Sequence, residues 1–243
     1  MAKAKTNSTS SKGRRGKAQP SFARTRIISI VSNKGGVGKT TLSVNLAAAA
    51  EIAGLKTAII DLDPQSSAEL WKDVRGEKGP SVYGVKWGRL KEAVKAAEAD
   101  GFDLVIIDTP PKIEDAITPA AKLADFCLIP VVPSAPDLQA IGATMALFDR
   151  FNVQAAVVLN ACPNSAGLKA GARAVVQKAY DFPLCPIEIG RRVDFVHAHA
   201  EGKGVVEFAP AGKAADEIVS LFEWTLKVLA GLDKGRTIDK EAA

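Results

Sequence analysis

Short runs of β-branched and other apolar residues recur along the chain from residue 27 onward. The runs that predict strands cover residues 27–32, 57–62, 104–108, 126–132 and 155–160. They are apolar at consecutive positions rather than alternate ones, which is typical of strands buried on both faces of a parallel sheet. A further run at residues 82–87 follows a Gly/Pro-rich break and predicts another strand, whose place in the sheet the sequence does not assign.

Segments with apolar residues at helical spacing alternate with these strands. The predicted helices cover residues 41–53, 67–74, 89–99, 113–123, 138–151, 168–180 and, after the last strand, 213–229. This alternation predicts an α/β fold, a doubly wound and mostly parallel sheet flanked by helices. We expect one domain over residues 26–230, because a chain of 243 residues with 47% hydrophobic content can bury one substantial core. The tryptophans, Trp71, Trp87 and Trp224, are expected to pack at helix and strand edges.

The two ends of the chain differ in composition from its body. Residues 1–26 hold eight Lys and Arg residues and no acidic ones, so the net charge of +5 belongs to this segment, and the remainder is slightly acidic. Residues 1–25 are predicted to be a disordered basic tail, since no large apolar residue other than Met1 precedes Phe22. The tail is either a solubilising leader or an arm attracted to nucleic acid or acidic lipid. Residues 231–243 are polar and expected to fray.

Several protein classes are disfavoured by what the sequence lacks. No apolar region of a secretion signal follows the basic stretch, and no apolar run is long enough to suggest a membrane span. The cysteines, Cys127, Cys162 and Cys185, form no C-x-x-C pair, so neither a zinc site nor an iron–sulfur site is predicted. We therefore expect a cytoplasmic protein without stable membrane insertion.

The strongest chemical signal is the segment from Asn33 to Thr41, which follows a predicted strand and opens a helix. Glycines let the backbone curl so that successive N–H groups point into one concavity, and the helix N-terminus adds its positive end. The sequence therefore predicts a phosphate loop for ATP and Mg²⁺, formed by Gly35, Gly36, Val37, Gly38, Lys39, Thr40 and Thr41. Lys39 would reach the β- and γ-phosphates, the Thr40 hydroxyl would bind Mg²⁺, and Thr41 would contact the α-phosphate. The alternative is a chance Gly-rich turn.

Carboxylates stand at the ends of two further predicted strands. Asp61 and Asp63 follow one strand and project to the same side of an extended chain. We assign Asp61 to the outer shell of the metal and Asp63 to positioning the hydrolytic water, with the division between them open. Asp63 could instead cap the helix predicted at residues 67–74. Asp108 ends the next apolar strand and reads as the Walker B ligand of Mg²⁺, followed by a Thr-Pro-Pro turn that would sense the γ-phosphate.

The loop departs from the common pattern G-x-x-x-x-G-K-[ST], because Asn33 replaces the first glycine and Lys34 adds a second lysine. In this it resembles the deviant-Walker-A ATPases of the ParA/MinD group, whose mark is K-G-G-x-x-K-[ST]. Residues 61–65 and 106–111 are similar to that group's D-x-D-P-Q and I-I-D-x-P-P segments. The resemblance implies that Lys34 acts across an ATP-bound homodimer, so that Lys34, Lys39 and Asp63 form the catalytic set. It also implies that Asn160 hydrogen-bonds adenine.

The resemblance also points to nucleic acid. Arg191 and Arg192 fall in a loop where ParA proteins carry basic residues for DNA, and Lys203 and Lys227 could join them in a phosphate-binding face. A solvated charged turn is the alternative interpretation.

The chain looks most like the short ParA proteins of plasmid and chromosome partition, since few residues precede the first strand. That likeness implies a nucleoid-associated ATPase that dimerises on ATP, binds DNA without regard to sequence, and is stimulated by a ParB-like or cargo-adaptor partner. A MinD-like membrane positioner is disfavoured because the C-terminal residues lack an amphipathic helix. The alternatives are a conjugative-transfer relative, a positioner of non-DNA cargo, and a biosynthetic ATPase of the same fold.

Overall fold

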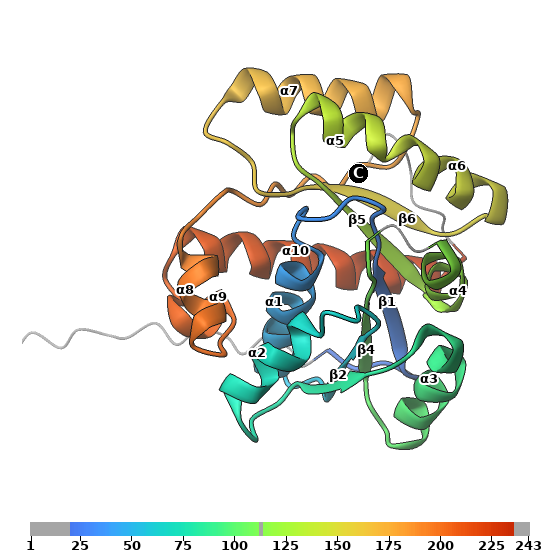
Figure 1. The fold of residues 1–243 in the computed structure, drawn as a ribbon, viewed down its shortest axis with the longest axis vertical. Coiled ribbons are helices and arrows are strands. Elements are labelled where there is room, and N and C mark those ends of the chain that lie inside the picture. The colour runs from blue at the N-terminus through green and yellow to red at the C-terminus, as the bar shows by residue number, and fades with distance from the viewer. Residues whose placement is uncertain (1–19, 112–113, 236–243) are drawn as a thin grey trace, which may run out of the picture.

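The computed structural model describes residues 20–111 and 114–235, which form an α/β fold around one parallel sheet (Figure 1). The strands in the described part are β1 (Arg26–Ile30), β2 (Thr57–Asp61), β3 (Ser81–Gly84), β4 (Leu104–Asp108), β5 (Phe126–Val131) and β6 (Ala155–Leu159). They pair in the order β3-β2-β4-β1-β5-β6, every pair parallel. The predicted doubly wound α/β fold is confirmed. The strand predicted at residues 82–87 corresponds to the edge strand β3, which spans Ser81–Gly84 and ends three residues earlier than predicted.

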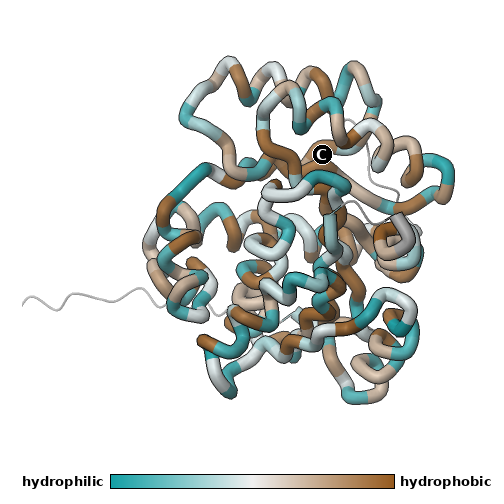
Figure 2. The backbone as a smooth tube through the Cα atoms, viewed as in Figure 1, coloured by the Kyte–Doolittle hydropathy of each residue, from teal (hydrophilic) through white to brown (hydrophobic). Residues whose placement is uncertain are grey.

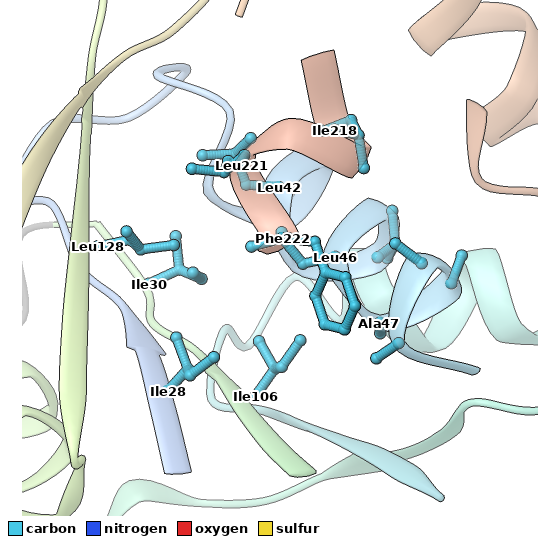
Figure 3. Close-up of a cluster of buried hydrophobic side chains, with 14 of the residues drawn as sticks. Ile28, Ile30, Leu42, Leu46, Ala47, Ile106, Leu128, Ile218, Leu221 and Phe222 are labelled. Carbon is cyan, nitrogen blue, oxygen red and sulfur yellow. The ribbon is translucent and has the colours of Figure 1, made fainter. Parts of the chain in front are cut away.

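One face of the sheet is covered by the helices that carry the first loop and the end of the chain. These helices are α1 (Lys39–Ile52), α2 (Ser67–Arg75), α8 (Asp194–Ala200), α9 (Val205–Phe208) and α10 (Lys213–Leu232). Ile28 and Ile106 of the sheet pack with Leu46 of α1 and Phe222 of α10 in one buried cluster (Figure 3). Helix α1 is therefore buried in the core on this face of the sheet, which fixes the position of the loop that precedes it.

The opposite face is covered by the remaining helices. These are α3 (Leu90–Ala99), which follows a 3-10 turn at Trp87–Arg89, α4 (Glu114–Leu123), α5 (Ala135–Ala140), α6 (Gly142–Phe151) and α7 (Ala166–Ala174). Ile27 packs on this face while its neighbour Ile28 packs on the other, because successive side chains of a strand alternate. Both faces are thus covered, and Figure 2 shows hydrophobic segments gathered along the central strands.

Two predicted helices differ from the observed ones for local reasons. The helix expected at residues 138–151 begins earlier, at Ala135, because the Ser134 hydroxyl accepts a hydrogen bond from the Asp137 N–H at 3.3 Å. It is also divided at Ile141 into α5 and α6. The helix expected at 168–180 begins at Ala166 after a similar Ser165 cap, and it ends in a π turn at Val175–Ala179.

Some of the predictions fall on residues at the two chain ends and near residue 113, which lie outside the described residues. This holds for residues 1–19 of the predicted basic tail, for residue 113 at the start of the helix predicted at 113–123, and for residues 236–243. Helix α10 continues to Leu232, two residues into the segment expected to fray, because Leu232 packs against the core. Within the described residues no helix is both long enough and apolar enough to cross a bilayer.

Candidate nucleotide-binding site

The loop between β1 and α1 lies at the carboxyl end of a central strand, where ligands bind in open α/β sheets. Gly36 and Gly38 have φ angles of 76° and 88°, in the left-handed region that disfavours side chains. A Cβ on Gly38 would also lie 2.3 Å from Nδ2 of Asn160, so Gly38 is required by both its backbone and its neighbour. The predicted phosphate loop thus has the backbone curvature that an anion nest needs.

The two lysines of the loop have different environments. Lys39, the first residue of α1, is only 6% exposed, and its Nζ donates to the Lys34 carbonyl at 3.1 Å. Burial lowers the pKa of Lys39, and the charges of Asp108 and Asp63 raise it by less. Lys34 is exposed. Lys39 therefore points into the site, whereas Lys34 is available to a group outside its own chain.

Asp108 lies at the end of β4 and is fully buried. Neither carboxylate oxygen has a well-formed hydrogen bond with any described residue, although the Thr40 hydroxyl is close enough to affect it. Burial raises the pKa of Asp108 to about 7, opposed by the Thr40 hydroxyl and the Lys39 ammonium. Two buried oxygens without a well-formed hydrogen bond, close to the hydroxyls of Thr40 and Ser43, fit Mg²⁺, which prefers oxygen ligands. Thr40 and Asp108 would hold the ion, and the ion would neutralise phosphate charge.

Asp61 is aligned with Asp108 across the paired strands β2 and β4 and is 1% exposed. Its carboxylate accepts hydrogen bonds from the backbone N–H of Asp63 at 2.9 Å and of Ala68 at 3.0 Å. Burial raises the pKa of Asp61, and these backbone donors lower it by less. Asp61 therefore shapes the turn that carries Asp63 and binds the first turn of α2. The cap considered for Asp63 is made by Asp61, and the outer-shell role of Asp61 stays a prediction.

Asp63 is half-buried and lies on the turn between β2 and α2. One of its oxygens accepts the Gln65 N–H at 2.9 Å, which fixes the direction of the carboxylate. Its charge acts on Lys39, so the two groups belong to one electrostatic site. The assignment of Asp63 to the hydrolytic water stays a prediction.

Asn160 directly follows β6 and is 4% exposed. Its Nδ2 donates to the carbonyl oxygen of Val37 at 2.7 Å, across 123 residues of sequence. The side chain therefore joins the phosphate loop to the end of β6, two strands away from β1 in the sheet, a role that the sequence did not indicate. The predicted bond to adenine stays a prediction.

Asn45 is a site-supporting residue that the sequence analysis missed. Its Nδ2 donates to the Thr41 carbonyl at 2.7 Å, and its Oδ1 accepts the Val205 N–H at 2.7 Å. It thus ties the first turn of α1 to the start of α9. The only signal in the sequence was a polar residue at a position of α1 that the apolar pattern marks as buried.

The basic residues predicted to contact DNA are not equivalent. Arg192 is ion-paired with Glu217 of α10, and Lys203 lies 2.8 Å from Glu201. Arg191 is exposed, and no side-chain partner is recorded for it in the described part of the chain. Among Arg191, Arg192 and Lys203, Arg191 is therefore the one whose side chain has no ion-pair partner in the described residues, and Lys227 of α10 is exposed as well. The contact of these residues with DNA stays a prediction.

Comparison with known proteins places this site in a family. Residues 28–206 match the CobQ/CobB/MinD/ParA nucleotide binding domain, which is more than half of the chain. The chain belongs to this family. The suspected ParA/MinD relationship is therefore confirmed, and the protein is a P-loop ATPase of the ParA/MinD type.

Two relatives and one structure illustrate its position in the family. The chain is 29% identical over 201 residues to maintenance of carboxysome distribution protein A of Halothiobacillus neapolitanus, covering 79% of this chain and 92% of that protein. It is 28% identical over 158 residues to the chromosome-partitioning ATPase Soj of Thermus thermophilus, covering 52% of this chain and 63% of that protein. The fold is similar to septum site-determining protein MinD from Pyrococcus horikoshii, solved with Mg-ADP, with a TM-score of 0.68, 23% identity, and 86% and 98% of the two chains covered.

Proposed function

We propose that the protein is an ATP-switched positioning ATPase that dimerises on ATP, binds DNA without sequence preference and releases it when a partner stimulates hydrolysis. The observation that carries this proposal is the contrast between Lys39, buried within its own site, and Lys34, exposed on the same loop. The exposed ammonium group of Lys34 is able to reach a phosphate of a nucleotide bound to a second copy of this chain. Such a cation stabilises the charge that develops in phosphoryl transfer.

ATP and Mg²⁺ are the proposed ligands of this switch. The phosphate loop supplies backbone N–H groups and Lys39, and Thr40 and Asp108 supply oxygen ligands. Membership of the ParA/MinD family and the Mg-ADP complex of a structural relative support this choice.

The cargo is proposed to be plasmid or chromosomal DNA, recognised through a ParB-like partner. The likeness to Soj, a chromosome-partitioning ATPase, supports it. A non-DNA cargo is the second candidate, since a relative that aligns over 79% of this chain is a carboxysome distribution protein. In both cases the nucleoid is the proposed location, with DNA as the surface on which the dimer moves.

The test is binding to random-sequence duplex DNA with ATP, ADP or no nucleotide across a salt series. We expect tight binding only with ATP, loss of binding in Lys39→Ala, and retention of nucleotide dependence in a chain lacking residues 1–19. Arg191→Ala should weaken binding uniformly across DNA sequences and reduce the salt slope by about one. Binding that ignores nucleotide and disappears with residues 1–19 would reduce DNA recognition to polyelectrolyte attraction and overturn the switch.

A further inference from the structure

The short segment between β3 and α3 presents an unusual surface. Trp87 is 40% exposed, against 1% for Trp71, and no ring contact is recorded for its side chain among the described residues. Trp87 lies just after the edge strand β3, and a large part of its indole is open to solvent. Lys86 and Arg89 flank it. The Arg89 backbone N–H donates to the Lys86 carbonyl at 2.8 Å, but both side chains are exposed and have no ion pair or hydrogen bond in the part of the chain described here. An exposed indole flanked by two cationic side chains without partners among the described residues is typical of a binding surface.

This segment forms one wall of a groove of about 850 Å³ at the carboxyl ends of β2 and β3. The second segment that lines the groove, within residues 61–69, carries the carboxylates of Asp63 and Glu69, and Leu62 and Val85 add apolar side chains to the lining. Glu69 is held in place because its Oε1 accepts the Gly84 N–H at 3.2 Å. The groove is thus lined by an acidic segment, which carries Asp63 and Glu69, and by a basic segment, which carries Lys86, the indole of Trp87 and Arg89.

We propose that this groove binds a segment of a partner protein that carries a basic, an apolar and an acidic residue in succession. The basic residue faces Asp63 and Glu69, the apolar residue lies on Trp87, and the acidic residue faces Lys86 and Arg89. Exposed Trp and Arg side chains beside a pocket are the residue types that dominate binding energy at protein interfaces. The proposal rests on the proposed function only in taking the occupant to be the partner that regulates the ATPase.

The charge distribution favours a polypeptide over nucleic acid. A nucleic-acid strand presents one sign of charge along its length, so phosphates placed on Lys86 and Arg89 would bring neighbouring phosphates toward Asp63 and Glu69. A polypeptide supplies both signs within a few residues. The concave shape also suits a narrow chain better than the broad surface of a duplex.

The position of the groove gives its occupant a route to the nucleotide site. Asp63 lines the groove, and Asp61, which fixes the Asp63 turn through a 2.9 Å hydrogen bond, lines it too. The Val85 N–H donates to the Asp61 carbonyl at 2.9 Å, so the basic segment of the groove is joined to the end of β2. An occupant therefore contacts the turn that carries the residue assigned to the hydrolytic water.

The test is selection of a random 12-residue peptide library on phage against the intact chain, with counter-selection against K86E/R89E. We expect enriched peptides with the basic, apolar, acidic order. A fluorescein-labelled synthetic copy should lose affinity about tenfold or more in K86E/R89E and in Trp87→Ala, as expected for removal of an interface anchor. The matched control is K91E/K95E, which makes the same charge change at exposed positions of α3 outside the groove. It should stay within about twofold of the unmodified chain.

Three results would overturn the inference. The selection could yield no peptide whose binding depends on Lys86 and Arg89, or a scrambled peptide of the same composition could bind equally well. A 20-nucleotide single strand of DNA could also displace the labelled peptide completely at equal concentration. Equal loss in K91E/K95E would count against it as well. Peptide binding is measured without hydrolysis and should persist in Lys39→Ala. Failure of the DNA switch with intact peptide binding would thus reject the proposed function alone, and the reverse would reject the groove alone.

Discussion

The Asn160 side chain donates a 2.7 Å hydrogen bond from Nδ2 to the carbonyl oxygen of Val37, joining the end of β6 to the phosphate loop. The same Nδ2 occupies the space beside Gly38 that a Cβ would need. The left-handed turn at Gly38 and the amide of Asn160 are therefore mutually dependent. The end of β6, two strands away from β1 in the sheet, therefore helps to hold the loop in shape.

Asn160→Ala is expected to weaken nucleotide binding about tenfold, because removing a buried hydrogen-bond donor leaves the Val37 carbonyl unpaired at a typical cost of about 1–3 kcal/mol. The measurement is titration with fluorescent ATP and GTP analogues. If Asn160 acts through the loop, both nucleotides lose affinity equally. If it contacts adenine, as the family resemblance implied, only the preference for ATP is lost. Gly38→Ala serves as the comparison and should abolish binding of both.

Lys34→Ala and Lys39→Ala are expected to separate nucleotide binding from ATP hydrolysis. Lys39→Ala removes a buried cation that faces the site and should abolish nucleotide binding. Lys34→Ala removes an exposed side chain and should leave ATP binding by the monomer within about threefold, while lowering turnover by a factor of about 10² or more. Equilibrium binding, light scattering with ATP and steady-state hydrolysis distinguish the steps. Normal turnover in Lys34→Ala would remove the argument for action across a dimer.

The sequence predicted the parts of the fold and site that depend on local pattern. Consecutive apolar residues predicted each buried strand, and the glycines of residues 35–38 predicted the turn that the structure shows. What it could not predict are contacts between distant segments. Nothing near Asn45 in sequence indicates that it meets Val205, 160 residues away, and nothing near Arg192 indicates its pairing with Glu217. The order of strands is of the same kind, since parallel strands with similar apolar sequences can exchange places without changing any local signal.

Asp108→Asn is expected to stabilise the nucleotide-free protein. Burial raises the pKa of Asp108 from 3.8 to about 7, so the cost of its charge is absent below pH 3.8, grows as the pH rises, and is complete above about pH 7. The variant should thus gain up to a few kcal/mol at pH 8 and little at pH 4. Urea unfolding at both pH values measures this. Stabilisation by Mg²⁺ with ATP should be lost in the same variant.

The half-buried Asp63 provides the comparison for that experiment. Asp63→Asn removes the same charge from the site and should shift unfolding by much less, because its carboxylate is partly solvated. Destabilisation of Asp108→Asn at pH 8 would contradict the interpretation that this carboxylate is an unpaired buried charge.

Glu207 connects α9 to α2 and is expected to make stability depend on acid pH. Its carboxylate accepts two hydrogen bonds from Arg75, at 2.7 and 2.8 Å, and one from the Gly204 N–H at 2.8 Å. Burial raises the pKa of Glu207, but Arg75 and Gly204 together outweigh burial, so the pKa lies below its ordinary value of 4.5. The ionised form therefore stabilises the fold above about pH 4.5, and that contribution is lost as the pH falls through the lowered pKa.

Glu207→Gln should accordingly cost about 2 kcal/mol at pH 7, where it leaves the guanidinium of Arg75 without its charged partner, and progressively less in more acidic solution. Urea unfolding at pH 7, 5 and 3.5 gives the comparison. Glu201→Gln is the matched control, because its pair with Lys203 is about half exposed on both sides and should contribute less than about 1 kcal/mol at any of these pH values. A loss in Glu207→Gln that is equal at all three pH values would show that shape rather than charge holds α9 against α2. In that case the segment from Gly204 would depend on the Asn45 hydrogen bond to Val205 for its position beside the phosphate-loop helix.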